Sequence, residues 1–125
     1  MIHLDTSFLI MALVHGSGQD RKLREWLRAG EPLGMSTIAW TEFLCGPVQA
    51  RDVELAASVV PQRLPFEEQD AAFAARLFNQ SGRRRGSLAD CMIAAAALRH
   101  KALLATHNPA DFDRFEPTGL TVIST

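Results

Sequence analysis

The chain has 125 residues, of which 47% are hydrophobic and 22% are charged, and this balance excludes a disordered chain in favour of an ordinary globular protein. At this length we expect one domain, residues 1–125, that buries roughly two-thirds of its unfolded surface. The formal net charge of −1 argues against a protein that coats nucleic acid or membrane through charge alone. Any contact with nucleic acid therefore needs a local basic patch or a bound cation.

The sequence also predicts a cytoplasmic protein without membrane contact. No apolar run approaches the 18 residues that a membrane-spanning helix needs. Asp5 precedes the short apolar stretch at residues 8–14, where a secretory signal would carry positive charge. The two cysteines, Cys45 and Cys91, lie in apolar helical segments without metal-ligand spacing, and we expect both to be reduced core residues.

Short apolar segments alternate with helical patterns along the chain. Strands are predicted at residues 2–4, 33–35 and 102–105, a brief extended piece at 63–66, and a last strand at 120–123. Helices are predicted over residues 8–14, 19–29, 38–45, 48–60, 67–79 and 88–100, with a loop or short turn over 106–115. This alternation is typical of the α/β class, in which right-handed crossovers join a parallel sheet that helices cover on both faces.

Acidic side chains recur where strands end and where apolar helices run. Asp5 directly follows the first strand and residues 106–111 follow a late one, so both fall on the same edge of a parallel sheet, where ligands collect. Glu42 is the only charged residue within residues 32–50. Asp90 precedes eight uncharged residues that include four consecutive alanines, which is typical of a buried helix.

Each of these acids also has a structural interpretation. Asp5 by itself could equally cap the following helix. Glu42 could be a surface glutamate, although its apolar surroundings favour a functional role. Asp90 could complete a capping box with Ser87, but aspartate is shorter than the usual glutamate and would reach the cap less well. For Glu42 and Asp90 we favour function.

Carboxylates that meet at one place need a cation nearby. A like-charge pair at about 4 Å costs on the order of 4 kcal/mol at an effective dielectric of 20. Such a cluster is stable only with a raised pKa or a bound cation. Oxygen ligands without a histidine or cysteine partner favour Mg²⁺ or Mn²⁺ over zinc. An ion of this kind activates water and stabilises the charge that develops in phosphodiester hydrolysis.

Four features together resemble a known family: LDTS at residues 4–7, the isolated Glu42, LADCMIAA at residues 88–95 and ATHNPADF at residues 105–112. In this order and at these spacings they resemble the PIN-domain ribonucleases, and in length they look most like the VapC toxins of bacterial toxin–antitoxin pairs. The resemblance implies one PIN-like α/β/α sandwich with a mostly parallel central sheet. It also implies Mg²⁺- or Mn²⁺-dependent endoribonuclease activity on structured or transfer RNA, a homodimer, and neutralisation by a cognate VapB-like antitoxin.

The resemblance also assigns roles to particular residues. Asp5 and Asp90 fall on the family's principal metal ligands, and Glu42 falls on its second acid. We therefore expect Asp5, Glu42 and Asp90 to be catalytic. Thr6 and Thr106 fall on the polar positions beside the metal, where we expect them to contact substrate.

The fourth acid is where this chain departs from the family pattern. Many members carry an aspartate two residues after the threonine, where this chain has Asn108. Asn108 offers a metal its carbonyl oxygen but no charge. Asp111 could complete the pocket as a catalytic acid or only anchor the loop, and both alternatives stay open. Metal affinity is expected to be weaker than usual for the family if Asp111 points away.

Basic and apolar side chains suggest contacts with other molecules. Arg83, Arg84 and Arg85 lie just before the Asp90 helix, and we expect Arg84 and Arg85 to hold RNA phosphates rather than form only a solvated loop. Apolar residues of the early helices are candidates for an antitoxin or dimer contact: Leu9, Met11, Leu13 and Trp26.

Two other functions compete with the ribonuclease. A haloacid-dehalogenase-like phosphatase also begins with a strand that ends in aspartate, but its chemistry needs a second aspartate two residues later, where this chain has Ser7. A catalytically weak or idle PIN-like domain could serve only to bind another protein. The missing acid at Asn108 is the one feature that supports this second alternative.

Overall fold

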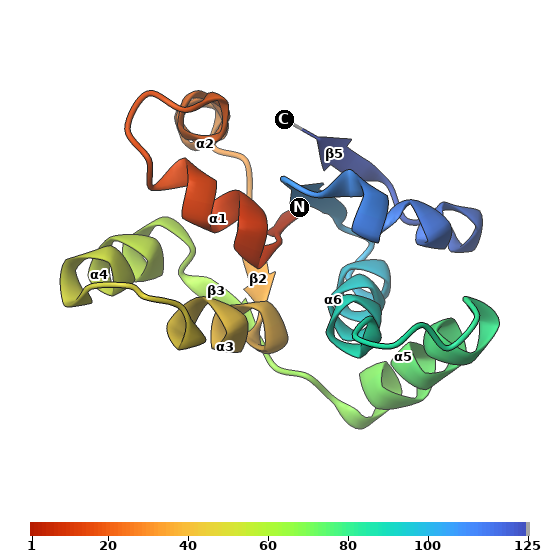
Figure 1. The fold of residues 1–125 in the computed structure, drawn as a ribbon. Coiled ribbons are helices and arrows are strands. Elements are labelled where there is room, and N and C mark those ends of the chain that lie inside the picture. The colour runs from red at the N-terminus through yellow and green to blue at the C-terminus, as the bar shows by residue number, and fades with distance from the viewer. Residues whose placement is uncertain (125) are drawn as a thin grey trace.

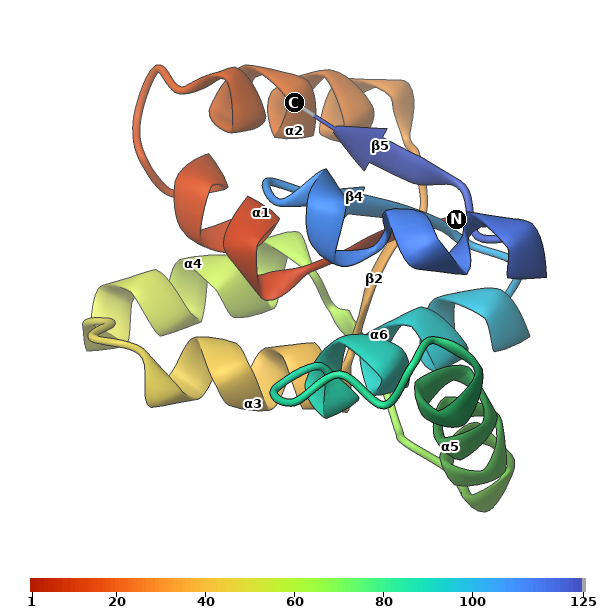
Figure 2. The ribbon, with the colours of Figure 1, turned by 45° about the vertical axis from the view of Figure 1, so that its right-hand side comes forward.

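The protein, seen here in a computed structural model that describes residues 1–124, is built around a five-stranded, all-parallel sheet in the order β3-β2-β1-β4-β5 (Figures 1 and 2). The strands are β1 (Ile2–Leu4), β2 (Leu33–Ser36), β3 (Gln62–Leu64), β4 (Leu103–Thr106) and β5 (Val122–Ser124). The predicted α/β class with a central parallel sheet is confirmed.

Six α-helices and two 3-10 helices connect the described strands. They are α1 (Thr6–Ala12), α2 (Gly18–Ala29), α3 (Thr37–Cys45), α4 (Ala50–Val59), α5 (Glu68–Gln80), α6 (Leu88–Arg99), η1 (Pro109–Asp111) and η2 (Asp113–Thr118). Helices α1 to α4 belong to crossovers that step from β1 to β2 to β3, whereas α5 and α6 lead back across the sheet to β4. Right-handed crossovers therefore place these two groups on opposite faces.

Most element boundaries lie within two residues of the sequence prediction, and two helix starts show how local capping chemistry sets them. Helix α1 begins at Thr6 rather than at residue 8, because Asp5 already occupies its N-cap position in extended backbone geometry. Helix α4 begins at Ala50 rather than at residue 48, since Gln49 and Asp52 form a reciprocal capping box there. Residues 106–115, predicted as a loop or short turn, contain η1 and the start of η2.

The core lies between the sheet and helices α1, α3 and α6. Its largest fully buried side chains include Phe8, Phe43 and Phe112. Helix α6 is buried along residues 93–97, as its alanines predict, because small side chains let a helix approach its neighbours closely. Cys91 is a buried free thiol as expected.

Three core and surface predictions were wrong. Cys45 is a free thiol but is exposed, because it lies in the last turn of α3 where the helix leaves the core. Leu9 and Trp26, predicted to be exposed contact residues, are buried. The Trp26 ring stacks on Phe8 at 5.4 Å between centroids, which fixes α2 against α1.

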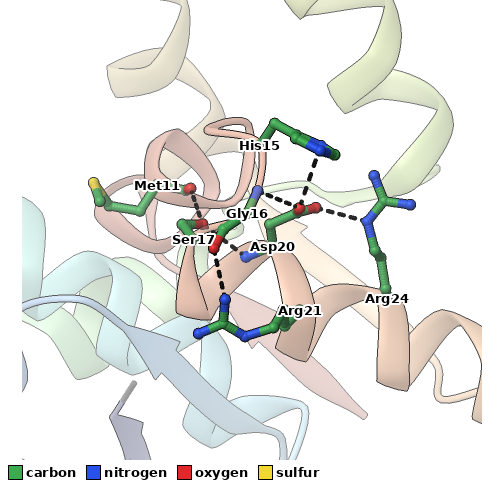
Figure 3. Close-up of polar contacts among 7 residues, drawn as sticks. All are labelled: Met11, His15, Gly16, Ser17, Asp20, Arg21 and Arg24. Atoms are coloured by element: carbon green, nitrogen blue, oxygen red, sulfur yellow. Dashed lines mark hydrogen bonds and ion pairs between the residues drawn. The ribbon is translucent and has the colours of Figure 1, made fainter.

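Two polar clusters hold the helices in place. In the connection from α1 to α2 (Figure 3), Ser17 accepts a hydrogen bond from the Asp20 backbone N–H and donates one to the Met11 carbonyl. The Asp20 carboxylate accepts from the Gly16 N–H and pairs with Arg24 at 2.9 Å.

In the second polar cluster, Arg99 of α6 forms an ion pair with the fully buried Asp70 of α5. The Arg99 Nε and Nη2 atoms donate to the two Asp70 oxygens at 2.5 and 3.0 Å. This fork geometry joins α5 to α6 beside their apolar contact.

Within residues 1–124, no helix is long and apolar enough to cross a membrane.

Candidate active site

The candidate site lies where the direction of the strand crossovers reverses. The chain winds outward from β1 to β3 and then returns to place β4 on the other side of β1. In open parallel sheets, such a switch point leaves a crevice beyond the carboxyl ends of the two adjacent strands. Leu4 of β1 pairs with Ala105 of β4, so Asp5 and Thr106 leave the sheet side by side.

Two hydroxyl groups hold the Asp5 carboxylate. Ser7 Oγ donates to Asp5 Oδ2 at 2.7 Å, and Thr106 Oγ1 donates to the same oxygen at 2.8 Å. Ser7 in turn accepts the His107 N–H at 3.0 Å, and Thr106 accepts the Asn108 N–H at 3.0 Å. Because each hydroxyl has one proton, this arrangement gives Asp5 two donors and sets the side chain's orientation before any ligand arrives.

The Asp5 side chain therefore does not cap helix α1. Among the described residues its carboxylate makes no capping hydrogen bond to α1, although it stands at the N-cap position. Its backbone N–H donates to Ala105 and extends the β1–β4 pairing by one bond. The Asp5 side chain is buried at the sheet edge and lines the candidate site.

Glu42 reaches the same place from α3. The Thr6 hydroxyl lies 2.8 Å from the Ala39 carbonyl and 3.3 Å from Glu42 Oε1, which ties α1 to α3. Burial raises the pKa of Glu42, and the nearby Asp5 charge raises it further, while the Thr6 hydrogen bond opposes them. A glutamate in this position holds its charge less readily than one on an ordinary helix surface.

Asp90 stands at the first turn of α6 and is the most perturbed acid of the group. Burial raises its pKa from 3.8 to about 6, with further upward contributions from Asp111, Asp5 and Glu42 and a downward one from Arg114. Ser87 donates its hydroxyl to the Arg84 carbonyl at 2.7 Å rather than capping α6. The capping-box interpretation of Asp90 is therefore not what the structure shows.

One cavity of about 270 Å³ connects these side chains. It is lined by Asp5, Thr6, Ser7, Ile10, Glu42, Asp90, Asn108 and Asp111. Both candidates for the fourth position, Asn108 and Asp111, thus line the cavity. Four acidic side chains and one asparagine line a common space, and carboxylate and amide oxygens are the donors that a hard cation prefers.

The fit to a cation rests on chemistry rather than on a preformed cage. Within residues 1–124, no set of three acidic, imidazole or thiol side chains is arranged closely enough to hold an ion as it stands. Burial is the main cause of the raised pKa values of Glu42 and Asp90, and the charges of neighbouring carboxylates raise both pKa values further. A divalent cation would relieve this repulsion, so the residues present fit such an ion.

The remaining predicted site residues lie around this cavity. Thr106 is fully buried behind Asp5, a placement that suits positioning of the carboxylate. Arg84 and Arg85 are exposed in the loop before α6 and lie outside the set of residues that line the cavity. Their binding of substrate stays a prediction.

Sequence reasoning missed Ser7 and Arg114. Ser7 was considered as the position where a phosphatase would need a second aspartate, yet its hydroxyl donates a hydrogen bond to Asp5. A hydroxyl two residues after a strand-end aspartate could have been noted, because short polar side chains commonly bond to near neighbours. No feature of the sequence around Arg114 indicated a role, because only the fold brings its charge near enough to Asp90 to lower the pKa of that carboxyl.

A family model described as PIN domain matches residues 2–116. The chain is similar to a solved structure of VapBC-1 from nontypeable Haemophilus influenzae, with 28% identity, a TM-score of 0.73, and 99% of this chain and 98% of that chain covered. A toxin–antitoxin complex from Klebsiella pneumoniae has 26% identity, a TM-score of 0.72, and coverages of 99% and 97%.

VapBC2 from Rickettsia felis, bound to a DNA fragment from its promoter, shares the fold, with a TM-score of 0.78, 20% identity, and coverages of 100% and 99%. No curated protein sequence matches the chain. Since the family match spans nearly all of the sequence and includes every residue that lines the carboxylate cavity, the chain belongs to the PIN-domain family.

Proposed function

We propose that this PIN-domain protein is a metal-dependent endoribonuclease and the toxin of a type II, VapBC-like toxin–antitoxin pair, acting as one domain in the cytoplasm. The observation that carries the proposal is the cavity at the switch point, where Asp5, Glu42, Asp90 and Asp111 face one another. Membership of the PIN-domain family supports a nuclease, and the similar complexes named above support a toxin.

Three residues of the cavity are the proposed metal ligands. Asp5 and Asp90, with the Asn108 carbonyl oxygen, would hold Mg²⁺ or Mn²⁺, and the bound ion would supply an activated water and stabilise charge on the phosphate. Ser7 and Thr106 keep Asp5 oriented through hydrogen bonds of 2.7 and 2.8 Å.

Two further acids complete the proposed site. Glu42 lines the cavity, where its carboxylate would accept a proton from the attacking water. Asp111 adds negative charge opposite Asp90, and so strengthens the demand for a cation.

The RNA would reach the site over basic and polar groups. Arg84 and Arg85 are exposed before α6 and can contact phosphates by charge. Thr6 lines the cavity beside Asp5, where its hydroxyl can contact the substrate. With a net charge of −1, binding depends on these local groups and on the cation.

A VapB-like antitoxin and a second copy of the chain are the proposed protein partners. The similar solved structures are toxin–antitoxin complexes. An apolar cavity of about 190 Å³ between α1, α2 and α4 offers a place for an antitoxin side chain, and its rim residues Leu27 and Leu55 are 46% and 52% exposed. Of the residues expected to make such contacts, Met11 and Leu13 are half-buried and stay candidates.

The decisive experiment is cleavage of a total RNA preparation by the purified protein with Mg²⁺, with Mn²⁺ and with EDTA. Wild-type protein is expected to give discrete products that need the ion, and Asp5→Ala and Asp90→Asn are expected to give none while remaining folded. Asp113→Asn is the matched control, because this exposed aspartate lies outside the cavity. Cleavage by the Asp5 and Asp90 variants at the wild-type rate would refute the site.

The alternative is a catalytically weak or idle domain that binds another protein. Asn108 favours it, because this neutral residue stands where many family members carry an acid. Under this alternative, no RNA is cleaved and calorimetry detects no ion binding by the wild-type protein. Asn108→Asp would then be expected to restore ion binding.

A further inference from the structure

We propose that Arg114, with the Gln80 amide, binds a backbone phosphate of the RNA in a second cavity that neighbours the carboxylate cavity. The proposal rests on the proposed ribonuclease function and deepens it, because it names a place where the strand is held outside the reacting bond. The chemical group recognised is a phosphodiester anion, without regard to base.

The second cavity has a volume of about 210 Å³ and lies between the end of α5 and η2. It is lined by Leu77, Gln80, Ser81, Arg114, Phe115, Pro117 and Thr118. Three of its lining residues are apolar, and its polar side-chain groups are one guanidinium, one amide and two hydroxyls. The guanidinium and the amide can donate hydrogen bonds to a ligand, whereas the Ser81 and Thr118 hydroxyls already donate theirs to the Phe78 and Phe115 carbonyls. No lining residue is acidic, so the cavity suits an anion.

The guanidinium of Arg114 lacks the partner that such a group needs. Its Nε and Nη2 atoms are buried and find no acceptor within residues 1–124. A buried donor without an acceptor destabilises the fold, and a charged donor does so more strongly. Arg99 shows the contrast, since its fork is filled by the Asp70 carboxylate.

Packing holds Arg114 in this unpartnered state. Its guanidinium lies over the Phe115 ring, 4.5 Å from the centroid. Phe115 is itself fully buried, so the ring is a fixed platform. A planar fork held on such a platform binds phosphate with little loss of side-chain freedom.

The position of this cavity relative to the proposed reaction centre also supports the proposal. Arg114 lines the second cavity and lies three residues after Asp111, which lines the carboxylate cavity. No carboxylate of residues 1–124 lies within ion-pair distance of Arg114. Ser81 begins the loop that carries Arg84 and Arg85. One RNA strand could therefore contact the basic loop, Arg114 and the carboxylate cavity.

Equilibrium binding in EDTA tests the proposal without cleavage. The probe is a fluorescein-labelled 2′-O-methyl RNA 12-mer, followed by anisotropy over a series of salt concentrations. Each phosphate contact with single-stranded nucleic acid contributes about −0.7 to the slope of log K against log salt. Arg114→Gln is expected to weaken binding and to reduce the slope by about this amount.

Arg76→Gln is the matched control. Arg76 also stacks on a phenylalanine, Phe73, at 5.4 Å, but it is exposed on α5 and lies outside both cavities. This variant is expected to keep the wild-type slope. Arg114→Lys, which keeps the charge without the fork, is expected to keep the slope while binding more weakly, and it serves as the folded variant if Arg114→Gln does not fold.

Three results would overturn the proposal. Wild-type slope and affinity in Arg114→Gln would show that Arg114 only offsets the charge of Asp90. If that variant does not fold, wild-type affinity in Arg114→Lys has the same meaning. Wild-type protein that neither binds the probe nor cleaves RNA would refute the ribonuclease function itself, and the phosphate site with it. If the wild-type protein cleaves RNA and the Arg114 variant binds the probe as the wild type does, only the phosphate site is refuted.

Discussion

Replacing Asp90 with asparagine is expected to stabilise the metal-free protein while abolishing its proposed activity. The pKa of Asp90 is about 6 in the folded protein, against 3.8 for the ordinary side chain, chiefly because the carboxylate is partly buried and faces other acids. A group with a raised folded pKa binds its proton more tightly in the folded state. Its ionisation therefore destabilises the fold increasingly as the pH rises from about 4 to about 6, and by a constant amount above that.

The magnitude follows from the shift. A rise of about 2 pH units corresponds to an upper limit of about 3 kcal/mol at 1.36 kcal/mol per unit. Because Asp90 is only half-buried, solvent screening reduces the expected difference at pH 8 to about 1 kcal/mol. Asparagine has no charge to desolvate and keeps nearly the same shape. We therefore expect Asp90→Asn to unfold at a higher urea concentration than wild type at pH 8 in EDTA, and at the same concentration near pH 3.5.

Added Mg²⁺ is expected to reverse the order of stability at pH 8. Ion binding to the folded state stabilises the wild-type protein increasingly as the ion concentration exceeds the Kd. The variant gains less, because it has lost a ligand. Asp20→Asn is a control of opposite sign, because the Gly16 N–H and Arg24 lower the pKa of Asp20. An Asp90→Asn variant that is less stable than wild type at pH 8 in EDTA would refute the electrostatic reasoning.

Three further predictions concern the groups that support the site and the fold. Thr106→Val removes the donor at 2.8 Å from Asp5 and leaves a backbone N–H without its acceptor, so we expect a loss of about 2–4 kcal/mol in urea unfolding; a change below 0.5 kcal/mol would contradict this role. Asp70→Asn breaks the buried pair with Arg99 and should cost about 3–5 kcal/mol in the same assay, whereas a neutral result would mean that the pair contributes nothing. Burial lowers the pKa of His3 to about 4, so the free energy of unfolding should fall by about 3 kcal/mol as the pH drops from 6.5 to 4. The His3→Leu variant should show a flatter dependence of stability on pH over this range, and an unchanged dependence would rule His3 out as its cause.

Local pattern alone determined most of the elements and the principal acids. The strand at residues 2–4 and the aspartate after it follow from a short apolar run that ends in charge. The buried helix behind Asp90 follows from a run of alanines, because a helix without polar residues has no face to give to water. Glu42 was recognisable as a lone charge in an apolar segment, and all three acids line one cavity.

The tertiary structure decided which of these side chains meet and what holds them. Ser7 and Thr106 both donate hydrogen bonds to Asp5 only because β1 pairs with β4, a strand that lies about a hundred residues later in the sequence. The burial of Leu9 and the exposure of Cys45 likewise depend on where α1 and α3 lie on the sheet. Local sequence reports propensity and periodicity within a few turns, whereas strand order, register and helix placement arise from contacts between distant segments, and these contacts assemble the site.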